Sequence, residues 1–190
     1  MSELETLNML LRLIGSSAVN VLETDHPDAA NARATMLRIS RRAQRKGWWF
    51  NIDYNVELQP NSNNEIEVNK SYSSVVIANT DIVTRGDRLY NRQTQDGRFE
   101  APVIATRIVK ILEWDDMPEV MTEYCAYLAA SEFVRDELED PQKEASLAQS
   151  ATGSFMDLKK QELEEGQYNI FNKPRVRRVL QGIQPIGRYS

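Results

Sequence analysis

The stretch Asp28–Asp53, DAANARATMLRISRRAQRKGWWFNID, changes its hydrophobic period at Gly47. Before this glycine, apolar side chains recur at steps of three and four residues, as on one face of a helix: Ala32, Met36, Ile39 and Ala43. After it, apolar and polar side chains alternate, as in a strand, with the apolar set Phe50, Ile52, Tyr54, Val56 and Leu58. The sequence therefore predicts a helix that stops at Gly47 and leads directly into a β-sheet.

Three more helices are predicted around this one. Caps and first-turn prolines mark three of the four helix starts: the Ser2/Glu5 capping box, Asp25 with Pro27, and Asp115–Pro118. The fourth helix is expected to open at Pro141 and to end at Gly166. Its inward-facing side chains are expected to be Ala148, Phe155, Leu158 and Leu163.

Short strands and turns are predicted between the second and third helices. After the strand that follows Gly47, apolar or β-branched segments are found at Val75–Ala78, Leu89–Tyr90 and Pro102–Ile111. Turn signals separate them at Gln59–Glu65 and Asp96–Gly97. The predicted fold is α+β: a mainly helical bundle of about four helices, with a β-strand insertion between the second and third helices and an extended C-terminal arm.

This fold divides the chain into four parts. They are the first part of the helical bundle (1–47), the β insertion (48–112), the second part of the bundle (113–166) and a basic C-terminal arm (167–190). The arm has no acidic residue and five basic ones: Lys173, Arg175, Arg177, Arg178 and Arg188. We expect such an arm to find order by docking on a neighbouring subunit or a partner.

Composition restricts the class of protein. A chain of 190 residues with 41% hydrophobic residues can bury a core, and its net charge of -5 argues against nucleic-acid binding over the whole surface. One cysteine excludes an internal disulfide and suits a reducing cytoplasm, and one histidine beside it makes a zinc site of the usual composition implausible. The start of the chain lacks the basic region of a signal peptide, and no apolar run is long enough to span a membrane.

Motifs of catalysis and cofactor binding are mostly absent, so neither a cofactor nor a metal is expected. His26 beside Pro27 is interpreted as a turn or cap residue, Cys125 as a buried small hydrophobe, and Arg85-Gly86-Asp87 as a hairpin turn. Four carboxylates cluster where the insertion returns to helix: Glu113, Asp115, Asp116 and Glu119. Helix capping is the preferred interpretation, and an acid–base pair of a glycosidase is the alternative.

The second helix carries a strongly basic face, which consists of Arg33, Arg38, Arg41, Arg42, Arg45 and Lys46. Such a face can contact nucleic acid, pair with acidic helices within or between subunits, or simply be solvated, and we favour pairing. The candidate contacts to a neighbouring subunit or to a partner protein are Arg38, Arg41, Arg42, Arg45, Lys173, Arg175, Arg177 and Arg178. The three tryptophans flank the insertion and are predicted to pack its junction with the bundle: Trp48, Trp49 and Trp114.

Three segments together resemble the tail tubular protein A family of short-tailed, podovirus-type bacteriophages. They are the opening stretch at 28–53, the run from Arg88-Leu89-Tyr90-Asn91-Arg92 to Asp96-Gly97-Arg98-Phe99, and Glu113–Glu119, EWDDMPE. The matches keep their order and spacing from about Leu4 to Tyr127, and none is a catalytic signature. After Phe133 the resemblance weakens, and the basic arm has no counterpart in it.

The resemblance implies a structural virion protein, not an enzyme. Such proteins form a head-to-tail adaptor ring, with twelve-fold symmetry, that joins the portal protein at the capsid vertex to the tail nozzle, a tail tubular protein B-like partner. Phage DNA passes through the ring without sequence-specific binding during genome ejection, and no membrane is contacted. The implied location is the virion tail, after assembly in the host bacterial cytoplasm. The alternative function is a tail-associated peptidoglycan or polysaccharide hydrolase that uses the acidic residues near Glu113–Glu119.

Overall fold

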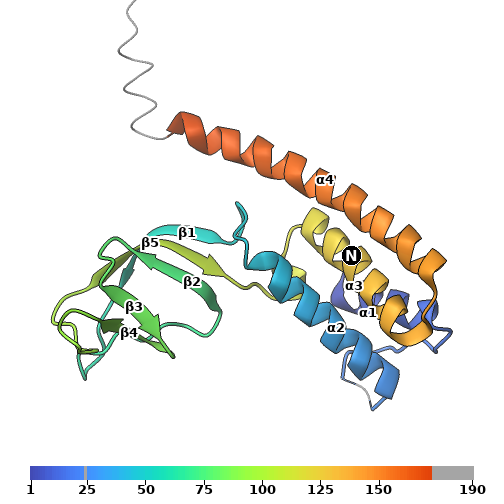
Figure 1. The fold of residues 1–190 in the computed structure, drawn as a ribbon, viewed down its shortest axis with the longest axis horizontal. Helices are drawn as coiled ribbons and strands as arrows, with labels where there is room; N and C mark the ends of the chain where they lie inside the picture. Colours follow the sequence, from blue (N-terminus) through green and yellow to red (C-terminus); the bar gives the residue numbers. More distant parts are fainter. Residues whose placement is uncertain (24, 173–190) are drawn as a thin grey trace, which may run out of the picture.

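Figure 1 shows the fold in a computed structural model, which describes residues 1–23 and 25–172. The elements are α1 (Glu3–Leu13), α2 (Pro27–Gln44), β1 (Ile52–Leu58), β2 (Tyr72–Ile77), β3 (Ile82–Arg85), β4 (Arg88–Asn91), β5 (Val103–Lys110), the 3₁₀ turn η1 (Trp114–Asp116), α3 (Glu119–Leu138) and α4 (Pro141–Asn172). The helices form one lobe and the strands another, and the two lobes lie end to end. The predicted α+β fold, with strands inserted between the second and third helices, is confirmed.

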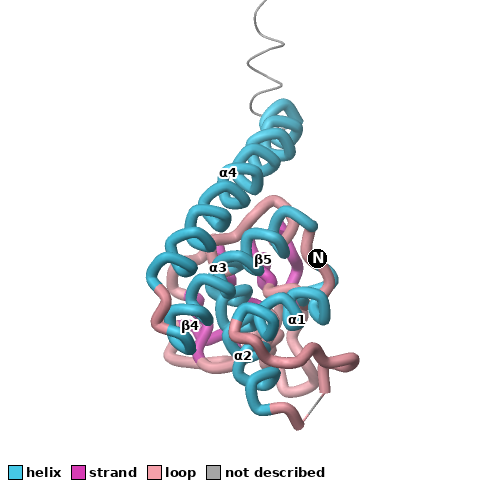
Figure 2. The backbone as a smooth tube through the Cα atoms, turned by 90° about the vertical axis from the view of Figure 1, so that its right-hand side faces the viewer, coloured by secondary structure: helices cyan, strands magenta, loops and turns pink. Residues whose placement is uncertain are grey.

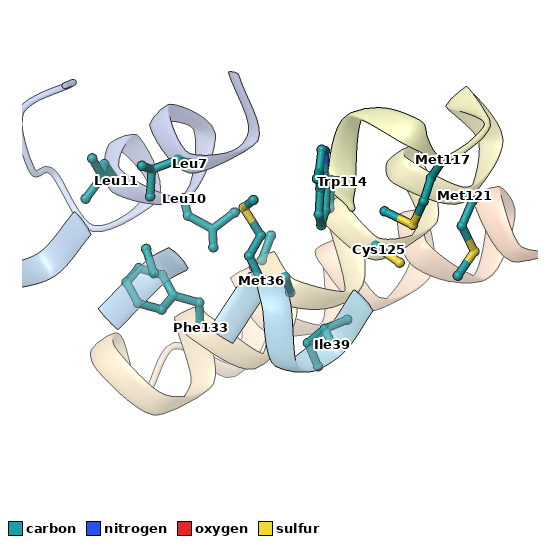
Figure 3. Packing of buried hydrophobic residues seen from close by; sticks show 14 of the residues in the cluster. Leu7, Leu10, Leu11, Met36, Ile39, Trp114, Met117, Met121, Cys125 and Phe133 are labelled. Atoms are coloured by element: carbon teal, nitrogen blue, oxygen red, sulfur yellow. The ribbon is translucent and has the colours of Figure 1, made fainter. Parts of the chain in front are cut away.

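The helical lobe encloses a core to which all four helices contribute (Figure 3). Its fully buried side chains include Leu7, Leu10, Leu11, Met36, Ile39, Met121, Phe133 and Leu158. Burying a side chain of this size contributes about 1.5–3 kcal/mol. Ala32, Met36 and Ile39 are fully buried and Ala43 is partly buried, which confirms the predicted apolar face of α2.

The start of α1 agrees with the prediction, whereas the start of α2 does not. The Ser2 hydroxyl accepts the Glu5 N–H at 3.2 Å and the Glu5 carboxylate accepts the Ser2 N–H at 2.8 Å, so the capping box is present. Asp25 does not cap α2, because Pro27 occupies the first helical position and the cap therefore falls on His26. The acidic residue of this turn is Asp28, which accepts a hydrogen bond from the Ser16 hydroxyl at 2.8 Å.

The β lobe consists of a three-stranded antiparallel sheet in the order β1-β5-β2 and a β3–β4 hairpin. Its separate core is formed by Leu58, Ile66, Val68, Leu89, Phe99, Ala105 and Ile108. The hairpin turns at Gly86, whose φ of +66° suits glycine, so Arg85-Gly86-Asp87 is a turn as predicted. The alternation predicted from Phe50 is partly wrong, because β1 begins at Ile52 and Tyr54 is 64% exposed next to Asn55, which has a left-handed φ of 56°.

The third helix begins later than predicted. The acidic residues Asp115 and Asp116 lie in η1, and α3 begins at Glu119 with Pro118 as its cap. Met117 precedes a proline and is extended, with a ψ of 149°, so η1 cannot continue into α3.

The fourth helix is longer than predicted, and its predicted inward face is correct only in part. It opens at Pro141 as predicted but passes through Gly166 and ends at Asn172, so residues 167–172 of the predicted arm are helical. A single glycine costs a helix only about 1 kcal/mol, which is too little to end a long one. Phe155 and Leu158 pack inward as predicted, whereas Ala148 and Leu163 are exposed. The other side chains that pack inward are Leu147, Ala151 and Ser154.

The length of α4 carries it past the bundle. Its 32 residues span about 48 Å, whereas the 20 residues of α3, against which it packs, span about 30 Å. Figures 1 and 2 both show the C-terminal part of α4 projecting beyond the other helices.

Candidate functional site

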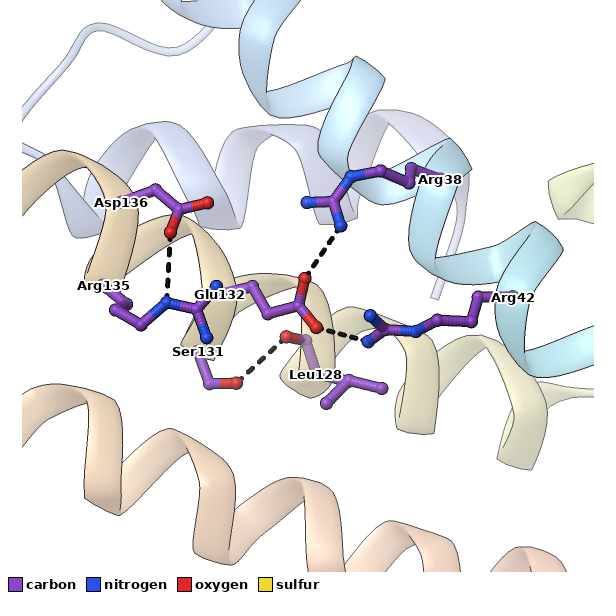
Figure 4. A network of polar contacts seen from close by, with 7 residues as sticks. All are labelled: Arg38, Arg42, Leu128, Ser131, Glu132, Arg135 and Asp136. Atoms are coloured by element: carbon purple, nitrogen blue, oxygen red, sulfur yellow. Dashed lines mark hydrogen bonds and ion pairs between the residues drawn. The ribbon is translucent and has the colours of Figure 1, made fainter.

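The exposed face of α2 carries the four predicted arginines, and two of them are bound within the subunit. Arg38 and Arg42, one turn apart, both donate to the carboxylate of Glu132 on α3 (Figure 4). The Arg38–Glu132 distance is 3.0 Å, and the Glu132 side chain is 11% exposed against 52% for Arg38. This arrangement fixes α2 to α3 through one hydrogen bond from each guanidinium, and both arginine side chains remain about half exposed.

The other two arginines, Arg41 and Arg45, form no ion pair among the residues that the structure describes. They line an open cleft of about 740 Å³ between α2 and the β lobe, together with Lys70 and the hydroxyl side chains of Ser71 and Ser73. The apolar part of the lining is Leu37, Ile111, Leu112 and Trp114, and Glu113 contributes a carboxylate.

A shallower depression of about 520 Å³ continues this cleft along α2. It shares Leu37, Arg41 and Arg45 with the cleft and adds the outer sides of Arg38 and Arg42. The result is one continuous basic surface with an apolar floor, suited to an acidic protein segment or to phosphate groups. We call this surface the basic groove.

The joint between the lobes is built on two fully buried indoles. Trp48 and Trp114 are each 1% exposed and belong to the helical core. The Trp48 indole N–H donates to the Ala43 carbonyl at 2.9 Å, and that of Trp114 donates to the Met1 carbonyl at 3.1 Å. Trp49 is half-buried, with an edge-on contact to Phe50. Both segments that connect the two lobes are therefore anchored in the helical bundle.

Two buried amide side chains fasten the same joint, and the sequence did not reveal them. Asn51, 2% exposed, accepts the Trp48 N–H at 2.7 Å and donates to the carbonyls of Gln44 at 3.1 Å and Lys110 at 2.6 Å. Gln44, fully buried, accepts the Leu112 N–H at 2.8 Å and donates to the Leu112 carbonyl at 3.0 Å. The chain entering the β lobe is thus bonded to the chain leaving it. In the sequence, Asn51 differs from its surroundings only in being a polar residue directly after three aromatic ones, at 48–50.

The projecting helix α4 also contacts this joint. Phe155 lies edge-on to Trp48 with ring centroids 6.2 Å apart, and the ammonium groups of Lys46 and Lys159 lie 4.5 and 5.1 Å from the Trp48 ring. The hydrogen bond to Lys159 lowers the pKa of Lys46, whereas the hydrogen bond to Glu162 raises the pKa of Lys159. Placing two cations on one ring links α2, α4 and the joint.

The remaining sequence candidates are a surface cluster of carboxylates and a buried thiol. The four carboxylates at Glu113, Asp115, Asp116 and Glu119 are all exposed, and Asp115 accepts the Glu3 N–H at 3.1 Å. Cys125 is fully buried, which raises the pKa of its thiol to about 12. In residues 1–23 and 25–172, no cluster of three potential metal ligands occurs and no helix is long and apolar enough to cross a membrane. Lys173, Arg175, Arg177 and Arg178 lie outside the described residues.

Comparison with known proteins gives matches over both lobes. Residues 4–178 match the model of a family described as tail tubular protein. The chain is also 29% identical, over 153 residues, to the tail tubular protein A of Klebsiella phage KP34. That alignment covers 80% of this chain and 81% of its relative.

Proposed function

The chain belongs to the tail tubular protein family, a family of structural proteins of phage tails, and from this premise we propose that it forms the adaptor ring between portal and nozzle. In this proposal, twelve copies close into a ring that binds the portal protein at the capsid vertex on one side. A tail tubular protein B-like nozzle binds on the other side. The observation that carries the proposal is that the family match runs through both lobes and the joint between them.

The structure supports this role in two physical ways. The joint is anchored by buried tryptophans and by satisfied buried amides, as a part that transmits load between two partners requires. The exposed surface also carries strongly charged regions of both signs, which suits contacts that are formed between separately folded subunits.

We propose further that DNA passes through the ring without being held. A subunit with a net charge of -5 gives a ring that is acidic as a whole, and phosphates bind tightly only where several cations are available to them. The basic groove is then directed at protein and not at the lumen. The proposed mechanism is assembly in the host cytoplasm and passage of DNA in the virion tail, not catalysis.

Particle size and symmetry test the proposal. A twelve-fold ring of 21.8 kDa chains has a mass of about 260 kDa, measurable by light scattering and visible as a ring by electron microscopy. The purified chain is examined alone and with purified portal protein. We expect rings in the presence of the portal, and a chain that remains monomeric and ignores the portal would refute the proposal.

A further inference from the structure

A convex acidic corner lies where α3 turns into α4. Residues 135–140 are all exposed, and the segment 135–144 carries five acidic side chains, at Asp136, Glu137, Glu139, Asp140 and Glu144, against two basic ones. Leu138 is 41% exposed at the tip, beside Glu139, which has a left-handed φ of 50°. We call residues 135–144 the acidic corner.

Several charges of the corner are already used within the subunit. Arg135 pairs with the adjacent Asp136, Lys143 donates to the Leu13 carbonyl, and Glu137 accepts from Asn31. Asp140 caps the first turn of α4. Two carboxylates of the corner have no hydrogen-bond or ion-pair partner among the described residues: Glu139, which is exposed, and Glu144, which is half-buried. The apolar side chain of Leu138 lies exposed beside Glu139.

The basic groove offers the opposite set of groups. Arg41 and Arg45 have no anionic partner in the described chain, and Leu37, one turn before Arg41, adds an apolar side chain to the same lining. Lys70 adds a third cation from the β lobe, so cations exceed the single carboxylate of Glu113 on the rim. A concave basic surface with an apolar floor is complementary to a convex acidic corner with an apolar tip.

We propose, on the basis of the proposed ring, that the basic groove of one subunit binds the acidic corner of the next. Within one chain Arg41 and Arg45 do not reach the corner: α2 contacts it through Asn31, which donates to Glu137, and Arg41 and Arg45 lie about 15 and 21 Å further along that helix. A contact between two different surfaces of identical subunits is heterologous, and such contacts generate rings when the rotation closes. The segment 173–190 cannot be the occupant, since it carries only positive charges, like the groove.

Reciprocal charge reversal tests this contact. The groove variant is Arg41→Glu with Arg45→Glu, and the corner variant is Glu139→Lys with Glu144→Lys. Each variant alone places like charges opposite each other, and we expect the dissociation constant of assembly to rise by at least about 100-fold. An equimolar mixture of the two restores complementarity at every contact of an alternating ring, so assembly returns. Because misfolded chains would not assemble on mixing, this rescue separates a lost contact from a lost fold.

The matched control reverses two exposed charges elsewhere, Lys160→Glu on α4 with Arg98→Glu in the β lobe, and should assemble like the wild type. All samples are measured alone and with portal protein. If the wild type forms rings and both reversed variants do so equally well, the contact is refuted while the ring stands. The groove variant could also form intact rings and yet lose binding to the portal or to duplex DNA. That outcome would assign the groove to another partner and would refute the contact with the acidic corner. If the wild type forms no ring under either condition, the proposed function itself fails.

Discussion

Replacing Asn51 by alanine should loosen the joint between the lobes. The substitution removes three hydrogen bonds, from the Trp48 N–H and to the carbonyls of Gln44 and Lys110, at a side chain that is 2% exposed. Each of the three buried backbone groups left without a partner costs about 1–3 kcal/mol. After relaxation of the site, we expect the free energy of unfolding to fall by about 3–5 kcal/mol, which is a large part of the total stability of a domain.

Urea denaturation followed by two probes measures this effect. Trp48 and Trp114 lie at the joint, so tryptophan fluorescence follows the joint, whereas far-UV circular dichroism follows mainly the helices. The two transitions should coincide in the wild type and separate in Asn51→Ala, with fluorescence changing first. Asn69→Ala is the matched control, because Asn69 is exposed and its side chain accepts only the Ser71 N–H, at 2.9 Å. A loss below about 1 kcal/mol in both variants would refute the role assigned to the Asn51 amide.

Three further predictions concern single residues. The Cys125 thiol should react with a thiol reagent only after the protein unfolds, because it is buried. Burial raises the pKa of this thiol in the folded state, so the contribution of Cys125 to the free energy of unfolding should decline as the pH rises from about 9 toward 12. Urea denaturation of the wild type and of Cys125→Ala across this pH range measures the decline. Gly47→Ala should cost more stability than Gly15→Ala, although both glycines have a positive φ. Only at Gly47 would the new methyl group meet neighbours: the Arg107 guanidinium and the methyl groups of Val109 at 3.1 Å and Ile52 at 3.2 Å. Thermal unfolding of the two variants measures the difference. Gly153→Ala should raise the free energy of unfolding by about 1 kcal/mol, because Gly153 lies inside α4 with open space around it, and an unchanged or lower melting temperature would contradict this.

The parts of the fold that could be predicted depend on local periodicity and on the position of proline and glycine. The apolar face of α2, the capping box of α1 and the turn at Gly86 each depend on residues close in sequence, and the structure has all of them. The end of α4 could not be predicted in this way, because a helix of 32 residues packed on α3 tolerates one unfavourable glycine at Gly166.

The sequence predicted which residues belong to the candidate site but not how they are arranged. The sequence supplied the basic face of α2, but whether an arginine binds Glu132 or lines an open cleft depends on how α3 and the β lobe pack against that helix. The amides of Gln44 and Asn51 were missed for the same reason. Asn51 bonds to the backbone of Lys110, 59 residues away in sequence, and Gln44 bonds to that of Leu112, 68 residues away.

The spacing of the arginines on α2 explains why one basic face can serve both folding and assembly. Arg38 and Arg42 are four residues apart and form one row, and Arg41 and Arg45 form a second row turned by about 60° around the helix axis. Since the first row is held by Glu132, the helix cannot rotate to bury the second row, which stays exposed beside the cleft. A loss of Glu132 would therefore act on stability and on the presentation of the groove together. Reversal of Arg41 or Arg45 costs the fold only the favourable interaction with the C-terminal end of α2, about 0.3–1 kcal/mol each, and acts mainly on assembly. This separation is what allows charge reversal at the second row to report on the contact between subunits and not on the fold.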